Sequence, residues 1–197
     1  MIMIINCFRY IMANKKNVII LASGGVDSTA CINYYKKMGF QIKAIFIDYS
    51  QKACYNELLS IRKIVSHYNI ELEILFVNTA ITFPSGEIKG RNAMFVIMAL
   101  LANPTFQGII ALGIHSGGNY YDNTPAFVNH INEILIGYCD SRVLLDAPFI
   151  DWDKQMVFQY CKEENVPIHL TYSCEIGEKQ PCGRCLSCKD RTMLNVS

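Results

Sequence analysis

The stretch Val18-Ile-Ile-Leu-Ala22, continued by Ser23-Gly-Gly-Val-Asp-Ser-Thr29, decides the fold of this 197-residue chain. Its β-branched apolar run predicts a buried parallel strand, and the paired glycines that follow predict a tight turn. From Asp27 to Met38 the apolar side chains recur at helical spacing, and Gly39 then stops the helix. A strand, a turn and a helix in this order are the opening of an α/β domain.

The same alternation continues along the chain and predicts a doubly wound, mostly parallel sheet of five strands with right-handed crossovers. The further strands are expected at 41–47, 71–77, 108–113 and 142–145, and the further helices at 53–68, 92–102, 125–138 and 152–165. The helix over 92–102 is apolar on nearly all sides, so it is predicted to be buried. In such sheets ligands bind at the carboxyl ends of the strands. Those ends lead into the segments 23–29, 48–57, 78–92 and 113–125.

Composition and charge favour one near-neutral globular domain. With 18 Lys and Arg against 17 Asp and Glu, the net charge is +1, and 51% of the residues are hydrophobic. These values exclude a disordered segment and a broadly basic nucleic-acid coat, although they leave room for a local basic patch. No apolar run approaches the ~20 residues that span a bilayer.

The apolar beginning of the chain does not have the pattern of a targeting signal. It carries no leading charge and no small-residue cleavage site, so we expect a cytoplasmic protein. A second start is indicated at Met12-Ala-Asn-Lys-Lys16, just before the first strand. Residues 1–12 are therefore either an extra segment, with Met12 as the true start, or an added edge strand or arm. The main domain is predicted to span 13–170.

The glycine-rich turn has the chemistry of an anion-binding loop. Glycines let backbone N–H groups approach a phosphate, and the start of a helix adds positive potential. Ser23, Ser28 and Thr29 contribute hydroxyl groups, whereas Asp27 repels phosphate unless Mg²⁺ lies between them. The pattern is neither the dinucleotide fingerprint nor the Walker loop. The alternative is a plain strand-to-helix turn capped by an Asp or Ser side chain.

The nine cysteines fall into two groups. Four crowd near the C-terminus with the spacing C-x7-C-x2-C-x2-C, and these are Cys174, Cys182, Cys185 and Cys188. Four thiolates fill a tetrahedral Zn²⁺ and leave no open position, which predicts a structural zinc site rather than one that activates water. An iron–sulfur cluster, which also takes four thiolates, and four free thiols are the alternatives. The scattered five, predicted to be small buried side chains, are Cys7, Cys31, Cys54, Cys139 and Cys161.

The S-G-G-x-D-S pattern after a first strand resembles the pyrophosphate loop of the ATP pyrophosphatases. Together with the cysteine spacing, it is similar to one family, the 7-cyano-7-deazaguanine synthases, over residues 16–192. The other segments that carry this resemblance are Phe46-Ile-Asp-Tyr-Ser-Gln51 with Glu57, Gly90-Arg-Asn92, Thr171-Tyr-Ser-Cys174, and Pro181-Cys-Gly-Arg-Cys-Leu-Ser-Cys188 with Arg191. The implied fold is that of the adenine nucleotide alpha hydrolases, with a zinc-binding tail over 171–197 packed on the same domain.

This resemblance implies an ATP-dependent carbon–nitrogen ligase that converts 7-carboxy-7-deazaguanine and ammonia to the nitrile. In that family ATP adenylates the carboxylate, ammonia then gives an amide, and a second activation dehydrates the amide. The resemblance further implies a homodimer that acts on a small molecule rather than on nucleic acid. ATP, Mg²⁺ and structural Zn²⁺ are the implied cofactors.

The resemblance also assigns residues. It gives ATP contacts to Ala22, Ser23, Gly24, Gly25, Val26, Asp27, Ser28, Thr29, Phe46, Asp48 and Tyr49. It gives catalytic roles to Asp27, Ser28, Asp48 and Arg91, and substrate contacts to Gln51, Arg91, Asn92, His115 and Asp122. An arginine suits such a place because its planar fork holds a carboxylate or a phosphate.

One loop departs from the family pattern. Where the family carries a Y-P-D-C-R-P-E-F-like stretch, this chain has Tyr120-Tyr-Asp-Asn-Thr-Pro-Ala-Phe127. Thr124 replaces the arginine and Ala126 the glutamate, which leaves the acceptor and the product open. The alternatives are a related adenylating ligase that stops at the amide or acylates an amine on a macromolecule, and a non-catalytic zinc-bearing binding module. Nearby, His115 is interpreted either as an acid–base group or as a hydrogen-bonding group of the loop.

Overall fold

The computed structural model describes residues 16–78, 88–117 and 120–193. The predicted extra segment 1–12, with Met12 and Cys7, lies outside these residues. Most of the predicted loop 78–90 also lies outside them.

Five parallel strands form one sheet, as the sequence predicts, and the structure places them in the order β3-β2-β1-β4-β5. The strands are β1 (Asn17–Leu21), β2 (Gln41–Asp48), β3 (Glu71–Phe76), β4 (Gly108–Leu112) and β5 (Val143–Asp146). The strand order reverses between β1 and β4, because the chain first builds outward to β3 and then returns to the other side of β1. Doubly wound sheets bind their ligands at this reversal, beside the carboxyl ends of the strands.

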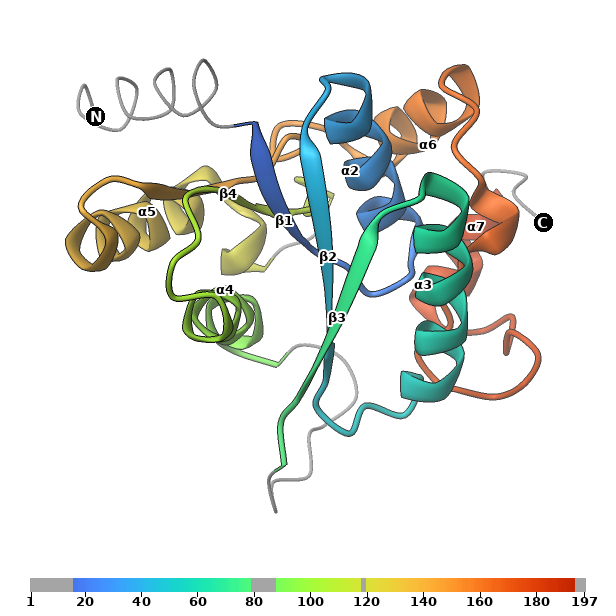
Figure 1. Cartoon of the computed structure of the whole chain (residues 1–197). Coiled ribbons are helices and arrows are strands. Elements are labelled where there is room, and N and C mark those ends of the chain that lie inside the picture. Colours follow the sequence, from blue (N-terminus) through green and yellow to red (C-terminus); the bar gives the residue numbers. More distant parts are fainter. Residues whose placement is uncertain (1–15, 79–87, 118–119, 194–197) are drawn as a thin grey trace.

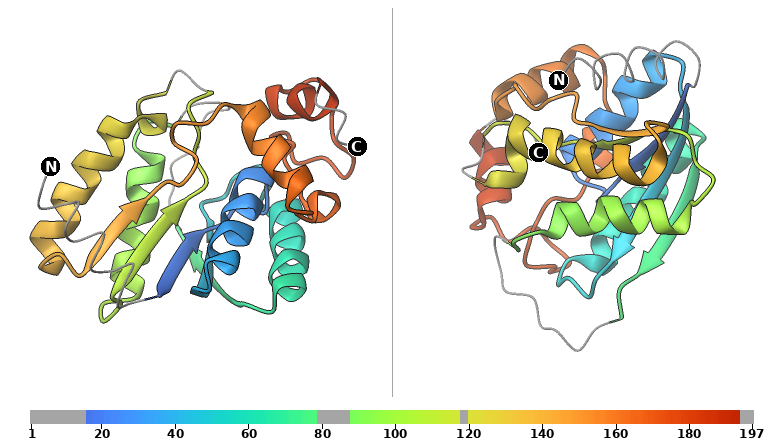
Figure 2. Two further views of the ribbon diagram at one scale, coloured as in Figure 1. Left: turned by 90° about the horizontal axis from the view of Figure 1, so that it is seen from above. Right: turned by 90° about the vertical axis from the view of Figure 1, so that its left-hand side faces the viewer.

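Helices cover both faces of the sheet (Figure 1, Figure 2). One face carries α2 (Val26–Lys37), α3 (Cys54–Tyr68) and α6 (Lys154–Glu163), and the other carries α4 (Arg91–Ala102) and α5 (Pro125–Cys139). Single 3₁₀ turns occur at Tyr121–Asn123 and Ile168–Leu170, and the cysteine-rich tail ends in α7 (Leu186–Met193). The helix α7 is not among the elements that the sequence predicts.

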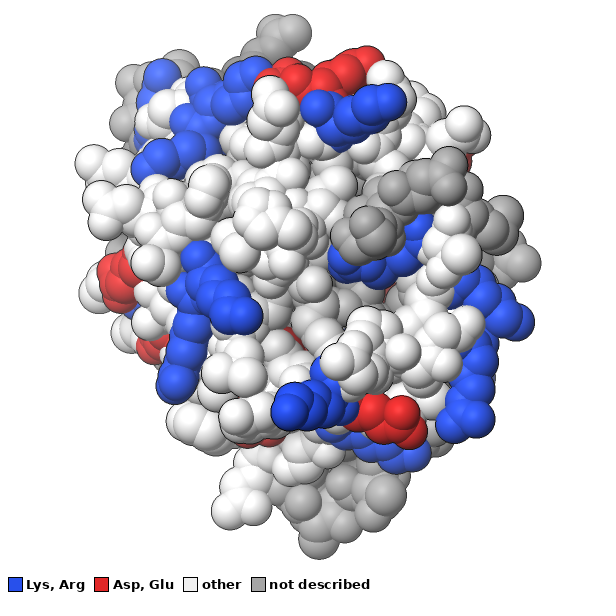
Figure 3. Space-filling view, turned by 90° about the vertical axis from the view of Figure 1, so that its right-hand side faces the viewer, with Lys and Arg blue, Asp and Glu red and all other residues white. Residues whose placement is uncertain are grey.

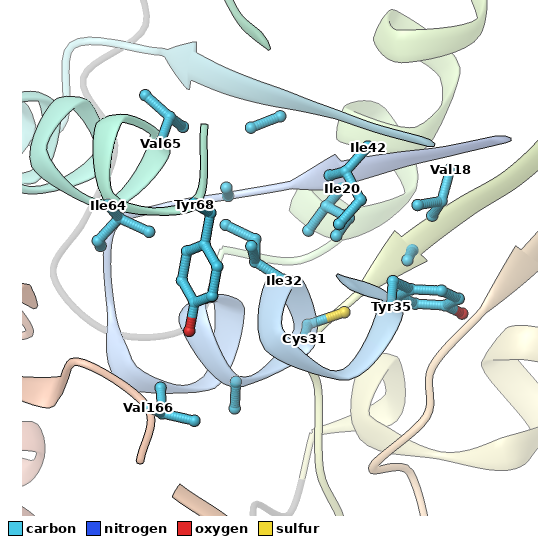
Figure 4. Close-up of a cluster of buried hydrophobic side chains, with 14 of the residues drawn as sticks. Val18, Ile20, Cys31, Ile32, Tyr35, Ile42, Ile64, Val65, Tyr68 and Val166 are labelled. Atoms are coloured by element: carbon cyan, nitrogen blue, oxygen red, sulfur yellow. The ribbon is translucent and has the colours of Figure 1, made fainter. Parts of the chain in front are cut away.

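Alternating side chains of the strands build two hydrophobic layers, one on each face of the sheet. In β1, Val18 and Ile20 join the layer under α2 and α3 (Figure 4), whereas Ile19 and Leu21 join the layer under α4 and α5. This follows from the period of two along a strand, which sends successive side chains to opposite faces. The strand is therefore buried from both sides, in agreement with its apolar sequence.

The helix α4 corrects one prediction, since it is not buried on all sides. Its fully buried residues are Asn92, Val96 and Ala99, whereas Leu101 is 73% exposed. The helix packs against the sheet with one side only, which leaves an apolar outer surface. Beyond Arg91 no residue of this helix is charged.

The distribution of charged side chains on the surface agrees with the near-neutral composition of the chain. On the face that includes α3 and α7, the Lys and Arg side chains stand in separate groups divided by uncharged surface (Figure 3). Within the described part of the chain, no helix has both the length and the apolar character needed to cross a membrane.

Candidate active site and metal centre

The glycine loop lies at the reversal of strand order, between β1 and α2. Gly24 has a φ of +78°, and a Cβ atom there would lie 2.7 Å from the carbonyl oxygen of Glu57. Only glycine fits both the left-handed backbone and this close approach to α3. Gly25 occupies the N-cap of α2 and no side chain caps the helix, so the turn is not of the Asp- or Ser-capped kind. The free helix start is suited to an anion.

The carboxylate of Asp27 is held by a lysine that the sequence analysis missed. The ammonium of Lys154, the first residue of α6, lies 2.8 Å from Oδ1 and 2.6 Å from Oδ2 of Asp27. His115 Nε2 lies 3.9 Å from the same carboxylate. Three elements distant in sequence thus place two basic groups around the acid that follows the glycine loop.

His115 lies in the loop after β4. Its Nδ1 accepts a hydrogen bond of 3.0 Å from the backbone N–H of Gly117, so the neutral ring carries its proton on Nε2, the atom nearest Asp27. Burial lowers the pKa of His115, against the opposing effect of the Asp27 charge, and this favours the neutral ring. The residue therefore combines the two interpretations given to it. It bonds within its loop through one nitrogen and presents a donor toward the site through the other.

The hydroxyl groups of the glycine loop form hydrogen bonds within the turn itself. Ser28 Oγ and Thr29 Oγ1 donate to the carbonyl oxygen of Gly25 at 3.1 and 2.7 Å, and Ser23 Oγ accepts from the N–H of Gly25 at 3.4 Å. Thr29 is fully buried. In this structure these side chains stabilise the start of α2. The side chains of three further predicted ATP contacts are buried in the core, and they are Ala22, Val26 and Phe46.

A second polar cluster forms where β2 ends, next to the glycine loop. The Gln51 side chain ties this segment together, because its oxygen accepts from the N–H of Tyr49 at 2.9 Å and its nitrogen lies 2.9 Å from Glu57 Oε2. Asp48 Oδ1 accepts from the N–H of Ser50 at 2.9 Å. The amide of Gln51, predicted to contact substrate, is therefore engaged in holding the loop after β2.

Arg91 and Glu57 form the charged centre of this second cluster. Arg91 begins α4 and its guanidinium carbon lies 5.9 Å from the centre of the Phe95 ring, which also packs against Tyr49. Its Nε is buried and has no hydrogen-bond partner among the described residues. Burial raises the pKa of Glu57, while the Gln51 amide and the charge of Arg91 lower it. A buried guanidinium nitrogen without a partner is suited to a carboxylate or phosphate ligand.

The remaining predicted substrate residues lie at the beginnings of α4 and α5. Asn92 is buried next to Arg91, and Asp122 lies in the turn before α5. Thr124, which replaces the arginine of the family pattern, caps α5 by accepting the N–H of Phe127 at 3.3 Å. Thr124, the residue that differs from the family pattern, therefore has a local structural role as the cap of α5.

The four clustered cysteines are brought together as the spacing predicts. Their ligand atoms all lie within 4.8 Å of one another, and the sulfurs of Cys182 and Cys188 are 3.9 Å apart. Zn–S bonds of about 2.3 Å in a tetrahedron require sulfurs roughly 3.8 Å apart. The backbone N–H groups of Arg184 and Cys185 approach the sulfur of Cys182 at 3.5 and 3.3 Å. The donor set and its spacing fit a metal ion bound by four sulfurs.

Hydrogen bonds favour the thiolate form of two of these cysteines, Cys174 and Cys182, whereas burial is the main cause that raises the pKa of Cys188 to about 12. Burial opposes the charged form of Cys174, but N–H donors of Cys182 and Ile176 outweigh it and lower the pKa of the thiol to about 6. The N–H groups of Arg184 and Cys185 lower the pKa of Cys182. Metals bind the thiolate rather than the thiol, so these donors prepare the ligands.

The scattered cysteines behave differently from the clustered four. Cys31, Cys139 and Cys161 are buried, as predicted. Cys54 corrects the prediction, because it is only partly buried at the start of α3. Burial and the neighbouring carboxylate of Asp48 raise the pKa of Cys54 to about 12, so this thiol stays protonated at neutral pH.

The tail that carries the cysteines touches the glycine loop and α3. The N–H of Tyr172 donates to the carbonyl oxygen of Gly24 at 3.0 Å. Asn56, in the first turns of α3, donates to the carbonyl oxygen of Gly177 at 3.0 Å. The cysteine cluster and the glycine loop are therefore neighbours, although they lie far apart in the sequence.

Comparison with known proteins identifies full-length relatives. The family model of the queuosine biosynthesis protein QueC matches residues 17–86 and 78–194. A 7-cyano-7-deazaguanine synthase from Prochlorococcus marinus is 29% identical over 207 residues, which cover 90% of this chain and 92% of that protein. The protein of the same name from Oceanobacillus iheyensis is 28% identical, with 91% of this chain and 93% of that protein covered.

Two solved structures share the architecture. The NMN synthetase from Francisella tularensis superposes with a TM-score of 0.56 at 17% identity, over 91% of this chain and 78% of that one. The tRNA thiolase from Methanococcus maripaludis, which carries a 4Fe–4S cluster, superposes with a TM-score of 0.60 at 17% identity, over 97% of this chain and 68% of that one. At these identities the likeness concerns the fold alone.

Proposed function

Because this chain belongs to the family of the queuosine biosynthesis protein QueC, we propose that it converts 7-carboxy-7-deazaguanine and ammonia to 7-cyano-7-deazaguanine with ATP. The relatives that it matches over nine-tenths of its length are synthases of this nitrile. The observation that carries the proposal is the free helix start of α2 behind Gly24 and Gly25, with Asp27 and Lys154 paired beside it.

Each residue at the loop has a part in handling ATP. The backbone N–H groups at the start of α2 hold the β and γ phosphates, and Asp27 holds them through Mg²⁺. With Mg²⁺ bound, Asp27 would hold the ion and Lys154, now beside Asp27, would supply positive charge to the departing pyrophosphate. The hydroxyl of Ser28 keeps the turn in shape, as its bond to Gly25 indicates. Asp48 and Tyr49, at the end of β2, lie where a doubly wound fold places the nucleoside.

The second cluster is proposed to hold the deazapurine. The guanidinium of Arg91 fixes the reacting carboxylate, because its buried Nε lacks a partner among the described residues. Asn92 and Asp122 flank this place, and the Nε2–H of His115 donates to an oxygen of the developing adenylate. The carboxylate oxygen attacks the α-phosphorus and pyrophosphate leaves. Ammonia then displaces AMP to give the amide, and a second adenylation at the amide oxygen ends with loss of AMP and two protons.

The remaining features support the same proposal. The four-sulfur site is proposed to hold structural Zn²⁺, since it offers no open position for chemistry. The tail over 171–197 is proposed as a segment packed on the 13–170 domain, in a cytoplasmic enzyme.

We also propose a homodimer, for which the uncharged outer surface of α4, with Leu101 73% exposed, is the candidate interface. Light scattering coupled to gel filtration measures that state.

One incubation distinguishes the candidate activities. The pure, zinc-loaded protein is mixed with 7-carboxy-7-deazaguanine, ATP, Mg²⁺ and ammonium, and the products are followed by mass spectrometry. We expect the nitrile together with AMP and pyrophosphate. An amide as the final product, or an adduct on protein or nucleic acid, would instead identify the related adenylating ligase. Absence of AMP with this acid would identify a binding module.

The Asp27→Ala variant tests the loop assignment within the same assay. Loss of the carboxylate that holds Mg²⁺ is expected to reduce AMP formation at least a hundredfold, which is the typical cost of removing a group that stabilises the transition-state charge. Asp151→Ala is the matched control, because Asp151 is exposed and lies just before α6. Equal AMP formation by Asp27→Ala and Asp151→Ala would show that the loop does not handle ATP.

A further inference from the structure

The carbonyl oxygen of Gly24 is held by donors from two distant parts of the chain. Ser60 Oγ, buried in α3, lies 2.9 Å from it, and the backbone N–H of Tyr172 lies 3.0 Å from it. The Ser60 hydroxyl also contacts the carbonyl oxygen of Leu170, so it bridges the glycine loop and the segment that leads into the cysteine tail. One loop carbonyl is therefore fixed by α3 and by the tail together.

Fixing this carbonyl sets the direction of the N–H group on the same peptide. In a trans peptide the C=O and the N–H point to opposite sides. With its oxygen directed toward α3 and the tail, the peptide between Gly24 and Gly25 directs the N–H of Gly25 away from them, to the side where Ser23 Oγ accepts it in a long hydrogen bond of 3.4 Å. A loop that binds phosphate needs its N–H groups directed toward the anion and its carbonyl oxygens directed away. Tyr172 and Ser60 impose that arrangement.

Residues that flank the four cysteines at both ends of the tail meet next to the contact with the loop. Tyr172 precedes Cys174 by two residues, and Arg191, three residues after Cys188, donates from Nη1 to the hydroxyl oxygen of Thr171 at 2.7 Å. Asn56 fixes the middle of the tail through the carbonyl oxygen of Gly177. Drawing the four sulfurs together therefore sets the path of residues 171–172 along the loop.

We infer that metal binding by the cysteine tail and pyrophosphate binding by the glycine loop are thermodynamically coupled, with Tyr172 and Ser60 as the positioning residues. The inference rests on the proposed phosphate role of the loop. It gives the metal a part in the affinity for ATP, although no metal ligand touches the nucleotide. Coupling is reciprocal, so bound pyrophosphate must raise the affinity for metal by the factor by which metal raises the affinity for pyrophosphate.

The first experiment measures this reciprocity. In this zinc-loss experiment the zinc-loaded full chain is equilibrated with a chromogenic chelator, and the zinc lost at equilibrium gives the zinc affinity with and without Mg²⁺ and pyrophosphate. We expect pyrophosphate to raise the zinc affinity about fivefold or more, which is the lower end of typical coupling between sites. Free pyrophosphate itself chelates zinc and promotes its loss, so the expected effect has the opposite sign. In Asp27→Ala the increase is expected to vanish.

The second experiment tests the bridge through Ser60 by calorimetry with Mg²⁺ and pyrophosphate. Ser60→Ala removes one donor from the Gly24 carbonyl, and we expect about fivefold weaker binding at full zinc content, in line with one hydrogen bond. Ser66→Ala, an exposed serine in the same helix, is expected to bind like the unaltered protein. If Ser60→Ala does not fold, the zinc-loss experiment decides alone.

The outcomes separate the two proposals. An unaltered protein that binds no pyrophosphate overturns the phosphate role of the loop, and the coupling with it. Binding of pyrophosphate with an unchanged zinc affinity overturns the coupling alone and leaves the proposed function standing.

Discussion

Lys154 is the residue that completes the site around Asp27. Its ammonium contacts both carboxylate oxygens, and the ammonium nitrogen lies 5.5 Å from the centre of the Phe158 ring. The ammonium therefore balances the negative charge of Asp27. A lysine is a mobile point charge on a flexible stem, which suits the transfer from carboxylate to phosphate oxygen that is proposed for it.

Replacing this lysine tests its part in charge balance. Lys154→Met keeps the hydrophobic stem and removes the ammonium, so we expect AMP formation to fall about a hundredfold or more, with unchanged zinc content and folding. Lys162→Met in the same helix is the control, because Lys162 is exposed. Equal activity of the two variants, measured as AMP released per enzyme, would exclude Lys154 from the site.

Asp146 makes folding stability depend on pH. Burial raises its pKa above the ordinary 3.8, although the hydrogen bond from the Tyr35 hydroxyl lowers it. The unfolded chain loses this proton at a lower pH than the folded protein. The contribution of Asp146 to stability is therefore fully present below the unfolded pKa and is lost as the pH rises through the folded pKa.

Asp146→Asn keeps an acceptor for Tyr35 and removes the buried charge. We expect its free energy of unfolding, relative to the unaltered protein, to increase as the pH rises above the ordinary aspartate value of 3.8. Asp140→Asn is the control, because the Asp140 side chain is 83% exposed in its pair with Arg142. Urea titrations at each pH supply the differences. A difference independent of pH would mean that Asp146 titrates normally.

At the scale of elements, β4 and α2 meet without a gap at Gly113. A Cβ atom on Gly113 would lie 2.5 Å from the carbonyl oxygen of Asp27, so the end of the strand rests on the first turn of the helix. Gly113→Ala is expected to lower stability by about 1–3 kcal/mol, as overpacking does. Gly137→Ala in α5, where nothing lies within 4 Å, is expected to stabilise by about 1 kcal/mol or less. Thermal unfolding compares the two, and similar melting temperatures would contradict the tight junction.

Most elements were predictable because local pattern and tertiary packing agree. The apolar run Val18–Leu21 is buried on both faces, and the strand forms within one residue of its predicted bounds. The helix α7 was not predictable, since its eight residues show no apolar period, and its place depends on the cysteines at its start. The burial of α4 was misjudged because composition does not show how many neighbours a helix has.

Only those parts of the candidate site that belong to a sequence motif could be predicted. The glycine loop and the cysteine spacing can be read locally, and the structure brings each group together. Lys154 has no motif, and its pairing with Asp27 joins residues from opposite ends of the chain. The role of Gln51 inside its own loop was equally hidden, because sequence does not show where an amide points.

At the scale of the whole molecule, the cysteine tail is the part that depends most on metal. Structural zinc contributes on the order of 10–16 kcal/mol in small peptides, against about 5–15 kcal/mol for the stability of a whole domain. The tail has few apolar contacts of its own with which to replace that contribution. The sheet and its helices, by contrast, have two hydrophobic layers.

Metal removal is therefore expected to loosen the tail before the rest. After chelation, trypsin is expected to cleave about tenfold faster at the basic residues around the cluster than in the zinc-loaded protein, since a locally unfolded segment is cut first. These sites are Lys179, Arg184, Lys189 and Arg191. Arg62 and Lys63 in α3 are the internal comparison, and mass spectrometry identifies the cuts. Equally accelerated cleavage in α3 would mean that the molecule unfolds as one unit.

The bond between Tyr172 and Gly24 has a consequence for how the protein is made. The ribosome releases Gly24 long before Tyr172, because the two residues are far apart in the sequence. A nascent chain that ends before Tyr172 thus lacks the donor that fixes the Gly24 carbonyl. The proposed phosphate binding by the loop therefore arises only after the cysteine tail has been synthesised.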